Sequence, residues 1–303
     1  MATLYTQQDK NVRRTWFLMA IFLVLVVAIG WFISWYYGSP IFIFAAIFIA
    51  LAMNIASYWY SDKISLSLAK AMPAKREDDP QLFQVVENLC ITAGLPMPKL
   101  YIIPDMAPNA FATGRDKNHA AVAVTQGLLD MMDKNELSGV LAHELSHIGN
   151  RDILLSTTVV VLVGFISIIA YVFTRSMWFG VGGDRRGNSR NSGGQLGAIL
   201  AIIGIIFVIL SPIVAQLIQL AISRKREFLA DADGALLTRY PEGLASALEK
   251  IQSYSQPMGT ANNATAHLYI SNPFGAKAGQ GIAKLFMTHP PTSERIAILR
   301  GME

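Results

Sequence analysis

Four long runs of this 303-residue sequence contain no charged residue and are almost entirely apolar. They cover residues 16–37, 41–60, 153–173 and 196–222. Each run provides the roughly 20 apolar residues that a helix needs to cross about 30 Å of hydrocarbon. The composition agrees, because only 15% of the residues are charged, whereas soluble proteins carry about 25% charged residues. We therefore predict a membrane protein with four transmembrane helices.

The spacing of the runs divides the chain into four parts. Residues 1–60 are predicted to form an N-terminal transmembrane hairpin, because only residues 38–40 separate its two runs and no cleavable signal sequence is evident. Residues 153–222 are predicted to form a second hairpin. Residues 61–152 and 223–303 are expected to fold together into one α+β domain, mainly helical and with a small β-sheet.

The distribution of basic residues predicts the orientation in the membrane. With four spans, 21 of the 25 Lys and Arg residues lie on one side, which the positive-inside rule places in the cytoplasm together with both termini. The net charge of +4 is small and argues against a nucleic-acid partner. The single cysteine, Cys90, excludes an internal disulfide and a cysteine-rich zinc ribbon.

The part between the two hairpins has recognisable helix and strand patterns. A helix is predicted from Pro80 to near Gly94. Strands are predicted at 99–103 and 120–125, with a third, edge strand at 109–114. Apolar residues then recur at helical spacing from residue 134 to 150.

This last predicted helix contains His143-Glu144-Leu145-Ser146-His147. At 3.6 residues per turn, the two imidazoles lie on the same helix face and can bind one metal ion. Glu144 lies beside them and can take a proton from a water without being a ligand. The alternative is a helix with two structural histidines and a solvated glutamate. The motif favours a zinc hydrolase. His147 lies only about 9 Å of helix before Ile153, where the third run begins, so we expect the metal to lie close beneath the membrane surface.

A catalytic zinc ion usually has three protein ligands. The extended motif H-E-x-x-H-x-x-G-x-x-H is absent, since Asn150 and Ile153 occupy its glycine and third histidine positions. Asp152 is too close on the same helix to turn back onto the ion. The third ligand is therefore expected from the segment after the fourth run or from residues 61–152.

If the fourth run continues as one helix past its end, a polar stripe that begins within the run offers a candidate ligand. Glu227 is the candidate third ligand, and Asp231, one turn later, can accept a hydrogen bond from a ligand imidazole. The alternative is that both acids neutralise the basic cluster at 224–226. The stripe has helical spacing and consists of Gln216, Gln219, Ser223, Glu227 and Asp231.

The order of these features resembles the HtpX family of bacterial membrane-bound zinc metalloproteases, relatives of the prenyl-protein endopeptidases. The resemblance covers nearly the whole chain. It rests on both hairpins and on four motifs, Pro108-Asn109-Ala110-Phe111-Ala112, Ala142-His143-Glu144-Leu145-Ser146-His147, Arg226-Glu227-Phe228-Leu229-Ala230-Asp231 and His289-Pro290-Pro291.

The resemblance implies a gluzincin site in which His143, His147 and Glu227 bind one zinc ion per chain and Glu144 is the general acid and base. It also implies a location in the bacterial cytoplasmic (inner) membrane. The expected substrates are misfolded or damaged membrane proteins and unfolded polypeptides, cleaved at the membrane surface in a stress response.

Two further roles are needed for peptide hydrolysis. A positive or donor group must stabilise the tetrahedral oxyanion, and His289 and Arg295 are the candidates, with Asn109 as a third. The alternatives are a capped turn for His289 and a solvated side chain for Arg295. The edge strand is expected to bind substrate as an added strand, through Asn109, Ala110, Phe111 and Ala112.

Three other functions compete with that of a broad protease. A catalytically silent scaffold would be indicated by a substituted Glu144, which is not seen. A transporter is disfavoured because no predicted span contains an acidic or basic residue. A protease restricted to lipidated peptides is not distinguished from a broad one by the sequence.

Overall fold

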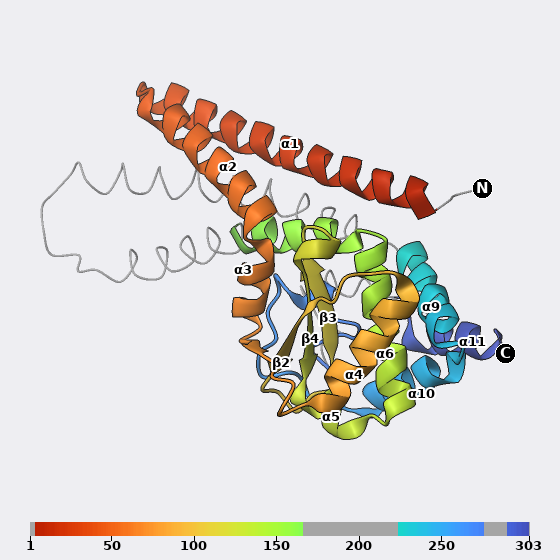
Figure 1. Cartoon of the computed structure of the whole chain (residues 1–303). Coiled ribbons are helices and arrows are strands. Elements are labelled where there is room, and N and C mark those ends of the chain that lie inside the picture. The colour runs from red at the N-terminus through yellow and green to blue at the C-terminus, as the bar shows by residue number, and fades with distance from the viewer. Residues whose placement is uncertain (1–3, 166–223, 276–289, 303) are drawn as a thin grey trace, which may run out of the picture.

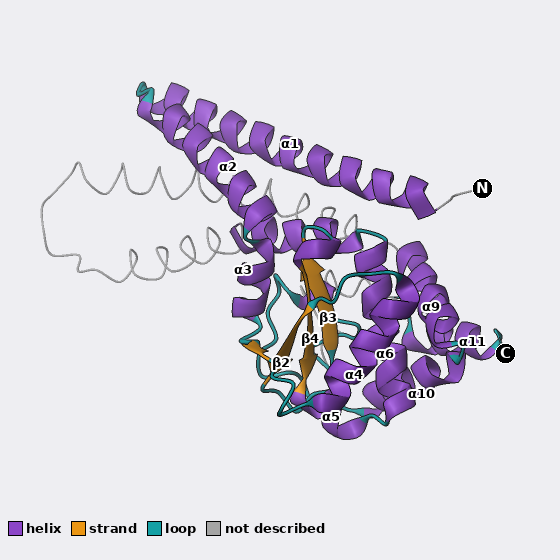
Figure 2. Cartoon of the chain, in the orientation of Figure 1, coloured by secondary structure: helices purple, strands orange, loops and turns teal. Residues whose placement is uncertain are grey.

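The structure is a computed structural model of the whole chain, and it describes residues 4–165, 224–275 and 290–302 (Figure 1). The described chain is mainly helical with one small sheet, which confirms the predicted α+β class (Figure 2). The helices, with short 3-10 helices written η, are α1 (Leu4–Tyr37), α2 (Ile41–Trp59), α3 (Ser61–Leu68), α4 (Pro80–Ala93), η1 (Lys117–His119), α5 (Gln126–Met131), α6 (Lys134–Gly149), the post-α6 helix (Asp152–Phe165), α9 (Arg224–Thr238), α10 (Pro241–Ser253), η2 (Ala266–Leu268) and α11 (Thr292–Arg300). The strands are β1 (Met72–Pro73), β2 (Lys99–Ile103), β3 (Ala110–Gly114) and β4 (Ala120–Thr125).

Two of the described helices, α1 and α2, are each long and apolar enough to cross a membrane. They form a hairpin that lies along one side of the molecule (Figure 1). The helices approach closely at Gly30, where an added Cβ atom would lie 2.1 Å from the Cβ atom of Ala46. Helix α1 begins at Leu4, well before the apolar run, so its first turns extend beyond the predicted span. The third predicted span begins within the post-α6 helix, and the fourth lies outside the described residues.

The four strands form a mixed sheet in the order β1-β2-β4-β3. Strands β2 and β4 are parallel, and β1 and β3 are antiparallel to their neighbours. The three predicted strands are confirmed, and β3 is an edge strand as expected. The short strand β1 was not predicted, because two residues give no alternating pattern.

Both faces of the sheet are buried, each by a different set of helices. Alternate side chains such as Val122 and Val124 pack with α4, α6 and α10. The side chains between them, such as Phe111 and Ala123, pack with α3, the post-α6 helix and the α1 side chains Leu18 and Phe22. The period of two along a strand places the two sets on opposite faces. Helix α6 therefore lies directly against the sheet, next to its edge strand β3 (Figure 2).

Both ends of α6 are sharply defined. Asp133 and Glu136 form a capping box at its start. At its other end, Arg151 has the positive backbone angle φ of 56°, and the post-α6 helix leaves at 85° to α6. The helix with the H-E-x-x-H motif is thus followed, after only two residues, by an apolar helix that runs in a different direction.

Close packing of α6 on α10 depends on Gly139. An added Cβ atom there would lie 2.6 Å from the backbone nitrogen of Leu244, and a backbone atom cannot move aside cheaply. We expect Gly139→Ala to lower the free energy of unfolding by about 1–3 kcal/mol, measured as a lower thermal midpoint in detergent. Gly149→Ala is the matched control on the same helix, because its Cβ atom would meet only Leu95 Cδ1 at 3.8 Å. Equal midpoints for the two variants would contradict this account.

Candidate metal centre

Helix α6 presents His143 and His147 on one face, one turn apart. Their Nε2 atoms lie 3.2 Å from each other, and the two rings are almost perpendicular, at 89°. His143 is fully buried, whereas the side chain of His147 is 17% exposed. The predicted pair of imidazoles therefore converges on one point at the edge of the domain core.

Glu227, from α9, approaches the same point. Its carboxylate lies 3.9 Å from Nε2 of His143 and 3.6 Å from Nε2 of His147. One ligand atom from each of the three residues lies within 4.8 Å of the other two. Helix α9 reaches this position because Gly234 packs against α6, where an added Cβ atom would lie 3.1 Å from the backbone nitrogen of His143. The structure thus brings together the three residues predicted to bind the metal.

A buried ion pair lies behind His143. Nδ1 of His143 is 2.9 Å from Asp231 Oδ1, and Arg295 donates two hydrogen bonds to the same carboxylate, at 2.6 and 2.8 Å. A third bond from Arg295 goes to the carbonyl oxygen of Ile270, at 3.1 Å. Burial opposes the charge of Asp231, but Arg295 and His143 lower its pKa to about 2. Asp231 is therefore a charged acceptor that orients the His143 ring.

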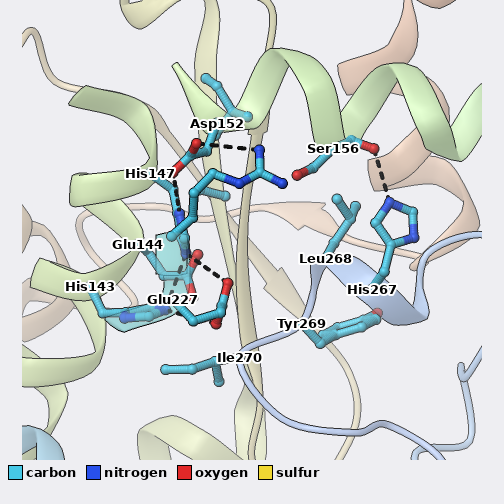
Figure 3. A pocket seen from close by; sticks show the side chains of 13 residues that line it. His143, Glu144, His147, Asp152, Ser156, Glu227, His267, Leu268, Tyr269 and Ile270 are labelled. Atoms are coloured by element: carbon cyan, nitrogen blue, oxygen red, sulfur yellow. Dashed lines mark hydrogen bonds and ion pairs between the residues drawn. The ribbon is translucent and has the colours of Figure 1, made fainter. Parts of the chain in front are cut away.

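A second carboxylate lies behind His147. Nδ1 of His147 is 3.1 Å from Asp152 Oδ2, and Arg226 lies 3.5 Å from Asp152 Oδ1. Burial opposes the charged form of His147, but the hydrogen bond to Asp152 and the charge of Glu227 raise its pKa to about 9. Both imidazoles therefore have a carboxylate on their Nδ1 atom, Asp231 on His143 and Asp152 on His147; Figure 3 shows the contact between His147 and Asp152.

This arrangement fits a zinc ion. A carboxylate accepts hydrogen bonds only, so each imidazole donates its Nδ1 proton to it and directs the Nε2 lone pair toward the other ligands. Two imidazole nitrogens and one carboxylate oxygen are a donor set of catalytic zinc, whereas magnesium and calcium take oxygen ligands. Because the pKa of His147 is about 9, metal binding at neutral pH would release a proton from this ring.

Glu144 lies beside the ligands and is 1% exposed. It accepts a hydrogen bond from the backbone N–H of Ala112 in β3. Within the described part of the chain, its Oε2 atom has no hydrogen-bond partner. Burial raises the pKa of Glu144 to about 7, despite the nearby charge of His147. A carboxyl group with such a pKa can both accept and return a proton near neutral pH.

A small cavity of about 30 Å³ adjoins these side chains. One water needs about 10–15 Å³ by this measure, so the cavity accepts an ion or a few waters but no peptide. The residues from His267 to Ile270 line it on the side away from α6 (Figure 3). His267 is anchored there through Nε2, 2.9 Å from the carbonyl oxygen of Ser156.

The same segment contacts the edge of the sheet. The backbone N–H of Ile270 donates to the carbonyl oxygen of Ala110 in β3, at 2.9 Å. The side chain of Asn109 donates to the carbonyl oxygen of Ser271 and accepts from its N–H. Phe111 and Ala112 are buried in the same strand. The predicted substrate-binding strand is thus engaged in part by the chain itself.

The other predicted site residues have different positions. His289 lies outside the described residues. Arg295 is fully buried, where its guanidinium is bonded to Asp231 and lies 3.9 Å from Glu227 Oε2, so it is not the solvated side chain of the alternative. Sequence reasoning considered Asp152 only as a ligand and missed its contact with the His147 ring. The signal was its position five residues after His147, just past the end of α6, where the chain can fold back.

Comparison with known proteins gives a consistent result. Residues 76–303 match the family described as peptidase family M48. A protease HtpX homolog from Caldanaerobacter subterraneus subsp. tengcongensis is 50% identical over 302 residues, covering 99% of this chain and 98% of the relative. HtpX homologs from Lactobacillus acidophilus and Pyrococcus abyssi are 46% and 48% identical, covering 99% and 95% of this chain and 100% and 94% of the relatives. A crystal structure of S. mikatae Ste24p aligns with a TM-score of 0.48 and 18% identity, covering 98% of this chain and 66% of that protein.

The metal centre leads to a prediction for Glu227→Ala. Loss of its carboxylate should weaken zinc binding by at least ~100-fold, the upper end of what a partner outside the ligand set costs. Zinc per chain, measured by elemental analysis after dialysis against a chelator, checks this. Asp233→Ala is the matched control, because Asp233 lies on the same helix but bonds Asn150 instead. Equal zinc retention in the two variants would exclude Glu227 as a ligand.

Proposed function

Because this chain belongs to peptidase family M48 and is a membrane-associated protease, we propose that it is an endopeptidase that depends on one zinc ion bound by His143, His147 and Glu227. The observation that carries the proposal is the convergence of these three side chains beside a buried carboxyl group with a pKa of about 7, that of Glu144.

Zinc, when bound, supplies a Lewis acid that polarises a peptide carbonyl and makes a water more acidic. Glu144 takes a proton from the attacking water and returns it to the departing amine. Burial, which raises the pKa of Glu144, favours its protonated form and so favours uptake of the water proton by the carboxylate. Asp231 and Asp152 keep the two imidazoles in the orientation that directs Nε2 to the reacting centre.

The negative charge of the tetrahedral oxyanion requires a donor opposite the metal. We propose His289 for this role, with Asn109 as a further candidate. The guanidinium of Arg295 lies 3.9 Å from Glu227 Oε2 and is bonded to Asp231. We therefore propose that Arg295 balances the negative charge of these two carboxylates. It would stabilise the oxyanion from a greater distance than a hydrogen-bond donor in direct contact with it.

The proposed substrates are misfolded or damaged membrane proteins and unfolded polypeptides, cleaved at the cytoplasmic surface of the bacterial inner membrane. Two observations favour substrates near lipid. Helices α1 and α2 are apolar enough to cross a membrane, and the post-α6 helix begins only a few residues after His147. The proposed role in quality control rests on the resemblance to the HtpX family, and the substrates would be recognised mainly through their backbone.

A peptide added to the edge of β3 provides that kind of recognition, because strand pairing uses backbone groups. The contact between Ile270 and Ala110 occupies part of this edge. We therefore propose that the segment from His267 to Ile270 moves away from β3 when a substrate binds.

The role of Glu144 predicts the effect of Glu144→Gln. Cleavage of an unfolded polypeptide by the solubilised, zinc-loaded chain should fall by about 10²–10⁴-fold, while zinc content stays unchanged, because Glu144 is not a ligand. Glu249→Gln is the control, since Glu249 is exposed and bonds only Arg300 among the described residues. Proteolysis that persists in Glu144→Gln would exclude the proposed general acid and base.

Hydrogen exchange tests whether the segment from His267 to Ile270 moves when a substrate binds. In the Glu144→Gln chain, which should bind an unfolded polypeptide without cutting it, exchange at the backbone amide of Ile270 should become faster on binding, because its bond to Ala110 opens. The amide of Ala123, in the interior of the sheet, serves as the internal reference. Unchanged or slower exchange at Ile270 would mean that substrates bind elsewhere.

A further inference from the structure

The first helix of the chain contacts the metal-binding helix directly. Nε2 of Gln8 donates to the carbonyl oxygen of Gly149, at 2.6 Å. Nδ2 of Asn11 donates to Asp152 Oδ1, at 2.6 Å, and to the carbonyl oxygen of Asn150, at 3.1 Å. Asn11 is 0% exposed. The start of α1, which precedes its apolar run, therefore packs on the corner between α6 and the post-α6 helix.

The contact between Asn11 and Asp152 has a fixed direction. Both partners of the Asn11 nitrogen, a carboxylate and a carbonyl, are acceptors only, so the atom that faces them must be the N–H₂ group. The Oδ1 atom of Asn11 has no hydrogen-bond partner among the described residues. The hydrogen bonding of this buried side chain is thus directed at the corner, and its shortest bond is to Asp152.

Asp152 transmits this contact to the metal centre. Its Oδ2 atom lies 3.1 Å from Nδ1 of His147, while its Oδ1 atom lies 2.6 Å from Asn11 and 3.5 Å from Arg226. The bond to Asn11 is the shortest of the three, and it restricts the rotation of the carboxylate. That rotation determines whether the other oxygen can orient the imidazole of His147.

We propose that Asn11 is a positioning residue of the metal centre, acting through Asp152 on His147. The inference rests on the proposed function, since it assumes that His147 binds zinc. It makes the first apolar helix a part of the metal centre as well as an anchor. Asn11 lies outside residues 76–303, the part of the chain that matches the peptidase family, so the peptidase region alone lacks this contact.

The competing explanation is that Asn11 only attaches α1 to the rest of the fold. Gln8 provides the matched control, because it also joins α1 to the end of α6 but does not contact Asp152. A purely structural role predicts equal effects of Gln8→Ala and Asn11→Ala on zinc binding. A positioning role predicts that only Asn11→Ala weakens it.

The experiment uses the full chain in detergent with Glu144→Gln, which prevents self-cleavage. Zinc affinity is measured by competition with a chromogenic chelator, and the thermal midpoint is recorded with and without zinc. Partners outside the ligand set change metal affinity by about 10–100-fold, and Asn11 acts one bond further away. We expect Asn11→Ala to lower zinc affinity by about 10-fold, with no change in Gln8→Ala.

Two further variants separate positioning from folding. Asn11→Leu keeps a side chain of similar size but has no N–H donor, and it should weaken zinc binding as Asn11→Ala does. In a chain with Asp152→Ala, adding Asn11→Ala should cause no further loss of affinity, because the two residues act in series.

The possible outcomes separate the role of Asn11 from the proposed function. Equal zinc affinities for Asn11→Ala and Gln8→Ala would overturn the inference, as would a loss that persists when Asp152 is already removed. In both cases the parent chain still binds zinc, so the proposed function stands. A parent chain that binds no zinc would refute the proposed function and this inference with it.

Discussion

The site depends on one requirement, that two imidazoles one helical turn apart direct their Nε2 lone pairs to a common point. A histidine ring can rotate and can carry its proton on either nitrogen, so each ring needs an acceptor on the opposite nitrogen. Asp231 provides this acceptor for His143, and Asp152 provides it for His147. Buried polar side chains in turn contact these two carboxylates, Arg295 at Asp231 and both Asn11 and Arg226 at Asp152.

The two carboxylates are fixed by residues from opposite ends of the chain. Asp231 receives a bidentate bond from Arg295 of α11, and Asp152 receives a short bond from Asn11 of α1. A buried ion pair such as Asp231 with Arg295 adds little net stability, because both charges lose their hydration. Its value here is geometric, since a planar guanidinium that binds both oxygens leaves the carboxylate no freedom to rotate.

Much of the fold was predictable because it depends on local patterns. The apolar runs predicted α1 and α2, alternation predicted the three longer strands, and the H-E-x-x-H motif with helical spacing predicted the position of α6. Glu227 was found by the periodicity of a polar stripe. The contact between Asp152 and Asn11 was not predictable, because it depends on how α1 packs against a corner more than a hundred residues away in the sequence. Gly234 gave no signal either, since its role appears only where α9 meets α6.

The corner after α6 has a mechanical consequence. Asp152 is at once the acceptor for the His147 ring and the first residue of an apolar helix that leaves at 85°. Asp152 thus links two helices, α6, which packs on the sheet, and the post-α6 helix. A change in the direction of the post-α6 helix would therefore move the carboxylate that orients the His147 ring.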